Sequence, residues 1–210
     1  MTTLVPPRHT PTNSKVEDVP VRRTTTTHFP TEPTATPTRP TTPTRPATTA
    51  ATIARYAWFT ARIGLAWIFL WAFLDKVFGW GYATPAGKGW IDGGSPTKGF
   101  LSGAKGPFAG SYHDLAGTTF ANWAFMLGLL GIGTALLLGV GMRIAAGAGA
   151  LLMTMMYTVV LPPTTNPVID DHLILAVLLI GLAAAGAGRT LGLGRWWANT
   201  RLVKRLPWLT

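Results

Sequence analysis

Two adjacent carboxylates and an imidazole stand at the start of an apolar segment near the end of the chain. Asp170, Asp171 and His172 lead directly into the apolar run of residues 173–180. Ionisable side chains at the edge of a membrane segment are costly and commonly serve a function. A neutral imidazole beside carboxylates can accept or donate one proton, which suits contact with a carbonyl or hydroxyl group of a quinone-like ligand.

The same stretch also has a structural interpretation, and both remain open. Asn166 followed by Pro167 is typical of a helix N-cap and first helical position. Asp170 and Asp171 would then lie in the first turn, where the helix dipole favours negative charge. Capping therefore accounts for the aspartates. It leaves His172 unexplained, because the same dipole disfavours an imidazolium.

The first apolar segment carries charges that are difficult to place in a membrane span. Arg62 and Asp75 are 13 residues apart, which is roughly 20 Å along a helix, whereas the hydrocarbon core is about 30 Å thick. At least one of them must enter the core, extend its side chain to the interface or find a partner. We expect Asp75 or its neighbour Lys76 to face the bundle interior; an interfacial charge pair at a helix end is the alternative.

The composition places these residues in a membrane protein. Hydrophobic residues make up 48% of the 210 positions and charged residues 12%, compared with about 25% charged residues in soluble domains. Apolar segments of about 20 residues can span a bilayer. We predict an all-α integral membrane protein, a four-helix bundle with spans at residues 54–78, 120–141, 144–161 and 168–188.

The distribution of charge predicts the orientation of these spans. Most basic residues border one end of them, and by the positive-inside rule this end faces the cytoplasm. The protein then lies in the cell membrane with both termini in the cytoplasm. This distribution of basic residues accounts for the net charge of +10 without a nucleic-acid partner. The aspartates beyond residue 50 all fall at the outer end: Asp75, Asp92, Asp114, Asp170 and Asp171.

The regions that flank the apolar segments differ strongly in composition. Residues 1–50 contain 10 of the 17 prolines together with 17 threonines. Such a segment cannot bury enough apolar area to fold, so we expect a disordered cytoplasmic tail. It either docks a partner or touches anionic lipid head groups, or it is a solvated extension without a specific partner. The membrane domain is predicted at residues 51–200, and residues 201–210 form a basic C-terminal tip.

The outer loop, predicted at residues 79–119, contains 11 glycines and is too long for a simple connection. We expect it to lie on the bundle as a lid. Ser95 followed by Pro96 predicts the start of a short helix. Residues 93–95 could bind an anion at that helix start, although capping explains the same residues.

Small residues at every fourth position predict close helix packing. Gly131, Ala135 and Gly139 follow this spacing in the second span. Small side chains let helices approach closely where lipid removes the hydrophobic driving force between them.

Two aromatic side chains are candidates for ligand contact. Tyr157 lies about one turn from the outer end of the third span, and Trp71 shares a helix face with Trp67. Interfacial tryptophans usually act as anchors, and walling a planar ligand is the less common role. The chain contains no cysteine, so it has no thiolate metal site or thiol relay, and we expect no metal.

The chain resembles the DoxX family of small membrane proteins, which is related to the DoxD subunit of thiosulfate:quinone oxidoreductase. The resemblance extends over residues 53–200 and is carried by residues 62–79, 128–133, 141–145 and 186–197; residues 93–97 and 166–172 resemble the actinobacterial branch. It implies a four-helix membrane bundle and electron transfer to menaquinone or another quinone, together with a partner redox subunit.

We therefore expect a quinone-associated redox membrane subunit with a polar site at the outer face. The candidate catalytic residues are Asp75, Lys76, Asp170, Asp171 and His172, and the candidate quinone-binding residues are Arg62, Trp71 and Tyr157. The alternative is a membrane scaffold or assembly subunit of a redox or stress-response complex, which uses the tail and the loop as docking surfaces.

Overall fold

The computed structural model describes residues 48–164 and 166–209, and all of them belong to one compact unit. Within these residues the secondary structure is entirely helical, which confirms the predicted all-α class. The predicted tail, residues 1–50, lies outside the described residues except for its last three, of which Thr49 and Ala50 belong to the first helix.

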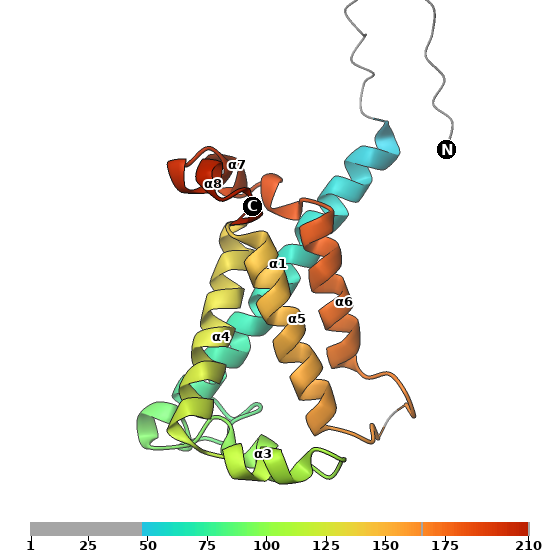
Figure 1. The fold of residues 1–210 in the computed structure, drawn as a ribbon. Helices are drawn as coiled ribbons and strands as arrows, with labels where there is room; N and C mark the ends of the chain where they lie inside the picture. The colour runs from blue at the N-terminus through green and yellow to red at the C-terminus, as the bar shows by residue number, and fades with distance from the viewer. Residues whose placement is uncertain (1–47, 165, 210) are drawn as a thin grey trace, which may run out of the picture. The chain divides into compact units, whose positions relative to one another are not determined.

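Four helices form the body of this unit (Figure 1). They are α1 (Thr49–Phe78), α4 (Thr119–Leu138), α5 (Met142–Val159) and α6 (Asp171–Ala184). The first three are long and apolar enough to cross a membrane. Helix α6 has 14 residues, which is about 21 Å, whereas residues 168–188 were predicted to form a complete span. Its length alone therefore does not establish a fourth crossing.

Two glycines lie where neighbouring helices pack closely against each other. A Cβ atom on Gly133 of α4 would lie 2.7 Å from Leu70 Cγ of α1, and one on Gly149 of α5 would lie 2.8 Å from Leu179 Cδ1 of α6. Gly131, in contrast, faces open space. The predicted small-residue contact on the second span is therefore wrong at this position, because the helix turns Gly133 and not Gly131 toward its neighbour.

Helices α4 and α5 are joined by a very tight turn. Gly139 and Gly141 both adopt left-handed backbone conformations, with φ angles of 72° and 61°, which residues with a side chain rarely adopt. The predicted spans 120–141 and 144–161 leave only two residues between them, and the structure confirms a short connection, which lies slightly earlier in the chain. We call this end of the bundle the turn end.

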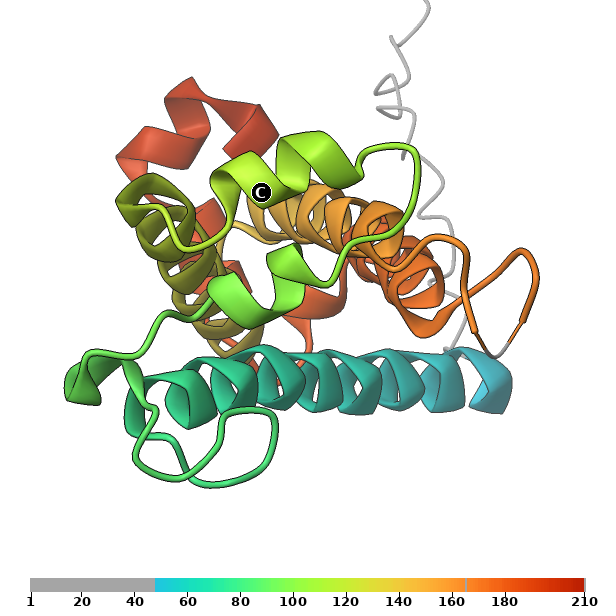
Figure 2. The same cartoon turned by 90° about the horizontal axis from the view of Figure 1, so that it is seen from below.

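The opposite end is covered by the segment between α1 and α4, and we call it the covered end. This segment contains η1 (Trp90–Asp92), α2 (Lys98–Ser102) and α3 (Ala109–Leu115). Figure 2 looks onto this end and shows α2 and α3 lying across the ends of α4 and α5. The predicted short helix begins at Lys98 rather than after Ser95. Residues 93–95 therefore do not open a helix, and the predicted anion site there loses its basis.

After α6 the chain forms four short elements at the turn end. They are η2 (Ala187–Arg189), α7 (Gly194–Ala198), α8 (Arg201–Arg205) and η3 (Pro207–Leu209). In Figure 1 α7 and α8 lie at the end of the bundle opposite α3. The backbone N–H of Leu193 donates to the Leu138 carbonyl oxygen at 2.8 Å. This bond fastens the terminal segment to the end of α4.

Candidate functional site: a cavity between α4 and α5

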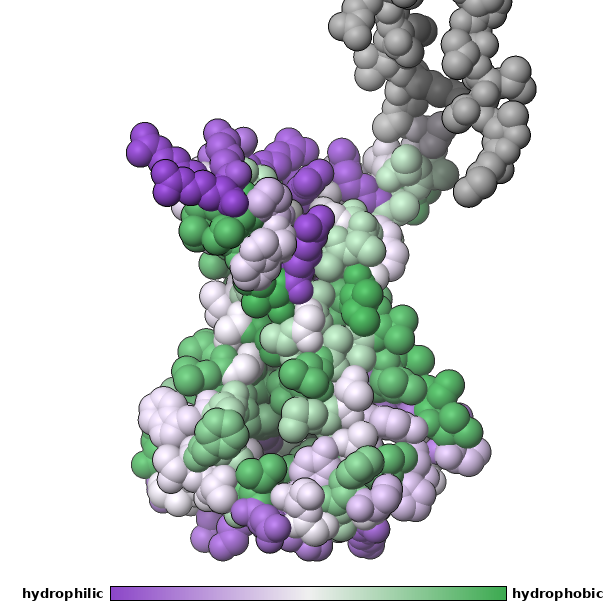
Figure 3. Space-filling model, viewed as in Figure 1, coloured by the Kyte–Doolittle hydropathy of each residue, from purple (hydrophilic) through white to green (hydrophobic). Residues whose placement is uncertain are grey.

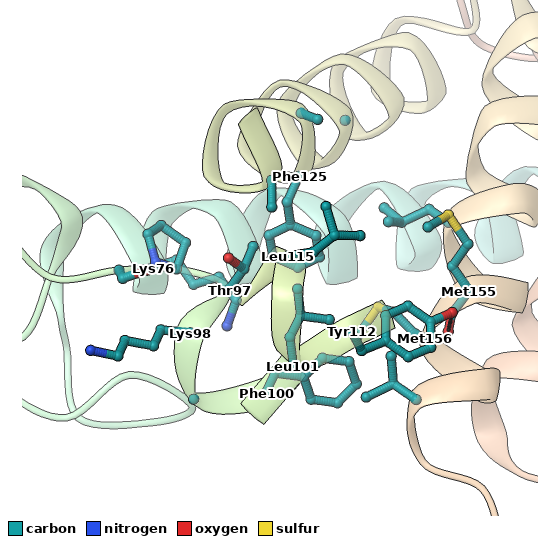
Figure 4. A pocket seen from close by; sticks show the side chains of 18 of the residues that line it. Lys76, Thr97, Lys98, Phe100, Leu101, Tyr112, Leu115, Phe125, Met155 and Met156 are labelled. Atoms are coloured by element: carbon teal, nitrogen blue, oxygen red, sulfur yellow. Dashed lines mark hydrogen bonds between the residues drawn. The ribbon is translucent and has the colours of Figure 1, made fainter. Parts of the chain in front are cut away.

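A cavity of about 1150 Å³ lies between α4, α5 and the covering segment. Helix α1 contributes Lys76 to its lining, and α2 and α3 contribute Leu101 and Tyr112 (Figure 4). Pockets for small molecules in proteins commonly have volumes of roughly 300–1,000 Å³. The space is therefore large enough for a ligand with a ring system and part of a chain.

The cavity exists because small residues face it from α4 and α5. Ala121, Ala124 and Gly128 repeat along α4 at intervals of three and four residues, and all three line the space together with Ala148 of α5. A Cβ atom on Gly128 would meet only Leu152 Cδ2, at 3.8 Å. From the turn end toward the covered end α4 and α5 diverge (Figure 1), so these short side chains leave the gap unfilled.

The cavity is polar at one end and apolar at the other. Lys76, Lys88 and Lys98 belong to its lining, which contains no aspartate or glutamate. Figure 4 places Lys76 and Lys98 toward one end, and Met155 and Met156 toward the other. An amphipathic molecule with an electron-rich head group and an apolar chain is complementary to this arrangement.

Lys76 is the basic residue that α1 itself brings to the cavity. It is half-buried, and its Nζ atom lies 5.8 Å from the centroid of the Phe125 ring. An ammonium group at this distance from an aromatic face is attracted by the ring quadrupole. The described residues give its ammonium group no hydrogen-bond acceptor, so its donors remain free for a ligand.

The covering segment is fastened over the cavity by Asn122 of α4. The Asn122 Oδ1 atom accepts hydrogen bonds from the Thr97 backbone N–H at 3.1 Å, from Thr97 Oγ1 at 2.7 Å and from Ser95 Oγ at 3.1 Å. Both Asn122 and Thr97 are buried. Polar side chains in apolar surroundings need such partners, and here they fix the start of α2 to the bundle.

Part of the cavity wall faces away from the protein. Phe120, Leu151 and Met155 line the cavity and are also exposed, by 76%, 64% and 44%. All three are apolar and belong to helices that can cross a membrane. In a bilayer these side chains would contact lipid, so the cavity borders the acyl chains as well as the covering segment.

Asp75 has a structural role in closing the loop after α1. The side chain is 1% exposed. Its Oδ2 atom accepts from the Thr84 N–H at 2.8 Å, and its Oδ1 atom accepts from the Tyr82 N–H at 3.4 Å. Asp75 does face the interior, as predicted. Its carboxylate, however, binds loop backbone and does not line the cavity.

Arg62 lies at the turn end, far along α1 from Asp75. Its guanidinium donates to the carbonyl oxygens of Leu136 and Leu137 in the last turn of α4, at 2.8 and 3.2 Å. It also donates to Thr190 and Leu191, both at 3.2 Å. A cation is stabilised at a helix C-terminus, where carbonyl groups lack intrahelical partners. Arg62 thus joins α1, α4 and the terminal segment.

The helix-mouth cluster of Asp170, Asp171 and His172 is arranged by helix capping. Helix α6 begins at Asp171, and Asp170 is its N-cap, whose Oδ1 atom accepts from the Leu173 N–H at 3.2 Å. The prediction that Asn166 is the N-cap was therefore wrong. The Asn166 side chain instead accepts from the backbone N–H groups of Val168 and Ile169, within the preceding turn.

The unexplained residue of the cluster, His172, has a partner within it. Its Nδ1 atom lies 2.6 Å from Asp170 Oδ2. The imidazole is therefore oriented by the N-cap aspartate. Among the described residues no hydrogen bond or ion pair joins His172 to Asp75 or Lys76. The predicted site residues of α1 and those at the start of α6 are therefore not joined by such a contact.

The two aromatic candidates also contact protein groups outside the cavity. The Tyr157 hydroxyl donates to the Val168 carbonyl oxygen at 2.6 Å. Trp71 packs between Trp67, Trp80 and Tyr82, with centroid separations of 5.6, 5.4 and 5.1 Å. Of the eight predicted site residues, Lys76 alone belongs to the cavity lining.

Sequence reasoning missed Asn122 and the cavity that it helps to cover. A signal for Asn122 was present, because it is an amide near the start of an otherwise apolar span.

Comparisons with protein-family profiles, with curated proteins and with solved structures found no match. The function is therefore inferred from the cavity and its charges.

Proposed function

We propose that the protein is a quinone-associated redox membrane subunit of the DoxX type, and that the quinone binds in the cavity between α4 and α5. The observation that carries the proposal is the combination of an apolar cavity of about 1150 Å³ with Lys76 at its polar end. A membrane quinone combines a polar ring with an apolar chain, so its two parts match the two ends of this space.

In this arrangement the quinone ring lies beside Lys76 and Phe125, and the ammonium group donates a hydrogen bond to a ring carbonyl. Charge-assisted hydrogen bonds are stronger than those between neutral groups. The apolar chain extends past Met155 and Met156 toward the lipid-facing wall. The chain has no cysteine to form a redox centre, so a partner redox subunit supplies electrons from a donor such as thiosulfate.

The topology that we propose has four crossings, with both termini in the cytoplasm of the cell. Helix α6 and the η2 turn that follows it make the fourth crossing in the direction opposite to α5. The covered end then faces outward. The basic residues of the terminal segment support this orientation through the positive-inside rule.

The absence of cysteine makes the topology directly testable. Single substitutions Ser14→Cys, Ser111→Cys and Asn199→Cys place one thiol each in the N-terminal region, in α3 and after α7. An impermeant thiol reagent applied to intact cells should label only the α3 variant. Labelling of Asn199→Cys without labelling of Ser14→Cys would instead establish three crossings.

The ligand is tested by mass spectrometry of small molecules that copurify with the protein in mild detergent. We expect a membrane quinone in the wild-type preparation. Lys76→Met should lower its occupancy by roughly 10- to 150-fold, because a hydrogen bond to a charged group contributes about 1.5–3 kcal/mol. Lys105→Met is the matched control, because Lys105 is exposed and does not line the cavity.

The same measurement on His172→Ala distinguishes the cavity from the helix-mouth cluster. Unchanged occupancy in His172→Ala together with a loss in Lys76→Met supports the cavity. A loss in His172→Ala alone would place the ligand at the start of α6. Two results together would favour the scaffold function. The wild-type protein would copurify with a partner protein but without quinone, and deletion of residues 1–50 would abolish binding of that partner.

A further inference from the structure

The terminal segment after α6 is basic throughout. It contains Arg189, Arg195, Arg201, Lys204 and Arg205, and no aspartate or glutamate occurs anywhere in residues 172–210. In Figure 3 hydrophilic side chains gather at the end of the unit where α7 and α8 lie. The aspartates of the described residues are instead in α1, in the covering segment and at the start of α6. The turn end therefore carries an uncompensated positive charge.

This segment is a fixed part of the fold. The Trp197 Nε1–H donates to the Leu209 carbonyl oxygen at 2.9 Å, which ties α7 to η3. Thr200 caps α8, because its Oγ1 atom accepts from the Val203 N–H at 3.4 Å. Val203 and Leu209 are buried. The basic side chains are thus presented from a defined surface.

Large apolar side chains are exposed among these charges. Trp196, Trp208 and Leu202 are exposed by 65%, 58% and 51%. Tryptophan is favoured at the boundary between lipid and water, and amphipathic helices that combine tryptophan, leucine and basic residues lie in this boundary. The segment has the composition of a surface that contacts phospholipid head groups.

A second cavity, of about 240 Å³, opens in the same region. It lies between the start of α5, the end of α6 and α7, and Arg143, Arg189 and Trp197 belong to its lining. Among the described residues neither guanidinium has a hydrogen bond or an ion pair with a protein group. Two cations that share a cavity without a carboxylate favour an anionic ligand.

We propose that the turn end binds anionic phospholipids, and that the second cavity receives the phosphate of one lipid head group between Arg143 and Arg189. The acyl chains of that lipid then lie along the apolar outer surface of α5 and α6, where Ile144 and Ile180 are exposed. This site is separate from the quinone cavity, and the inference does not depend on the proposed redox function.

Native mass spectrometry of the full-length protein in mild detergent tests the proposal, with phosphatidylglycerol and phosphatidylcholine as probes. Wild-type protein should bind phosphatidylglycerol several-fold more tightly. The double variant Arg143→Gln and Arg189→Gln should lose this preference. Arg55→Gln with Lys105→Gln removes the same charge at positions that line neither cavity and should retain it. Both glutamine pairs replace exposed side chains, so folding should be preserved, and the thermal midpoint checks this.

Three results would overturn the proposal. One is equal binding of the two phospholipids by the wild-type protein. Another is an equal loss of preference in both double variants, which would indicate net charge rather than a site. The last is displacement of bound phosphatidylglycerol by millimolar glycerol 3-phosphate, which would make the cavity a site for a soluble phosphate instead of a lipid.

Discussion

The Arg62 Nη1 atom lies 2.8 Å from the Leu136 carbonyl oxygen, at the point where α4 ends. The same guanidinium reaches two carbonyl oxygens beyond η2. One side chain therefore holds together three segments, because its partners Leu136 and Thr190 are 74 and 128 residues further along the chain. Helix α4 is held here by Arg62 and is joined to α5 by the tight turn at Gly139 and Gly141, so the two helices can separate at the covered end, where the large cavity lies.

Replacement of Arg62 by methionine should destabilise the protein strongly. Methionine keeps much of the apolar volume and removes every hydrogen bond to the four carbonyl groups. Each hydrogen bond to a charged group contributes about 1.5–3 kcal/mol, so we expect a loss of about 3 kcal/mol or more in the free energy of unfolding. Thermal unfolding in detergent measures the change. Arg55→Met is the control, because Arg55 is exposed on the same helix; equal effects would contradict this role.

The contact of α5 with α6 should depend on Gly149. Gly149→Val would place methyl groups against Leu179, where even a Cβ atom would lie only 2.8 Å from Leu179 Cδ1. Overpacking of this kind typically costs about 1–3 kcal/mol. Gly147→Val is a close control, because nothing lies within 4 Å of a Cβ atom there. The thermal midpoint of Gly149→Val should be lower than that of Gly147→Val.

Asn122→Ala should release the covering segment without unfolding the bundle. The substitution removes the acceptor shared by Ser95 and Thr97 and leaves the Thr97 N–H without this partner. We expect faster amide hydrogen exchange in residues 93–103, by roughly 10-fold or more, for a loss of about 1–3 kcal/mol. Exchange in α5 should not change. Asn199→Ala serves as control, because its amide donates only to Arg195 at an exposed position.

Gly128→Leu should block the cavity and leave the fold intact. A side chain at this position has room to enter the space, since its Cβ atom would meet only Leu152 Cδ2 at 3.8 Å. Quinone occupancy should fall to background while the thermal midpoint stays within a few degrees. Gly131→Leu, on the same helix, points into open space and should bind quinone as the wild type does. Full occupancy in Gly128→Leu would exclude this cavity as the site.

The positions of the three candidate membrane-crossing helices were predictable because long apolar segments have few alternatives. The predicted spans 54–78, 120–141 and 144–161 match α1, α4 and α5 within a few residues. The boundary of α6 was less predictable, since Asn166 and Asp170 both carry side chains that can cap a helix. In the structure Asp170 caps the helix, and Asn166 accepts from backbone N–H groups of the turn before it.

The candidate site could be predicted only in part. That Asp75 faces the interior followed from its depth in an apolar segment, but its partners, Tyr82 and Thr84, depend on the path of the loop. The sequence contains no pattern that distinguishes this cavity from ordinary close packing of helices. Alanine and glycine on α4 would fit a tight helix contact equally well, and only the divergence of α4 from α5 turns them into a cavity wall.

The exposed apolar wall of the large cavity determines how a ligand would reach it. Because Leu151 and Met155 face the region of the acyl chains, a hydrophobic ligand can arrive by diffusion within the plane of the bilayer. Its occupancy is then governed by its mole fraction in the lipid and not by its concentration in water. Diluting reconstituted vesicles with buffer should leave the site filled, whereas fusing them with ligand-free vesicles should empty it.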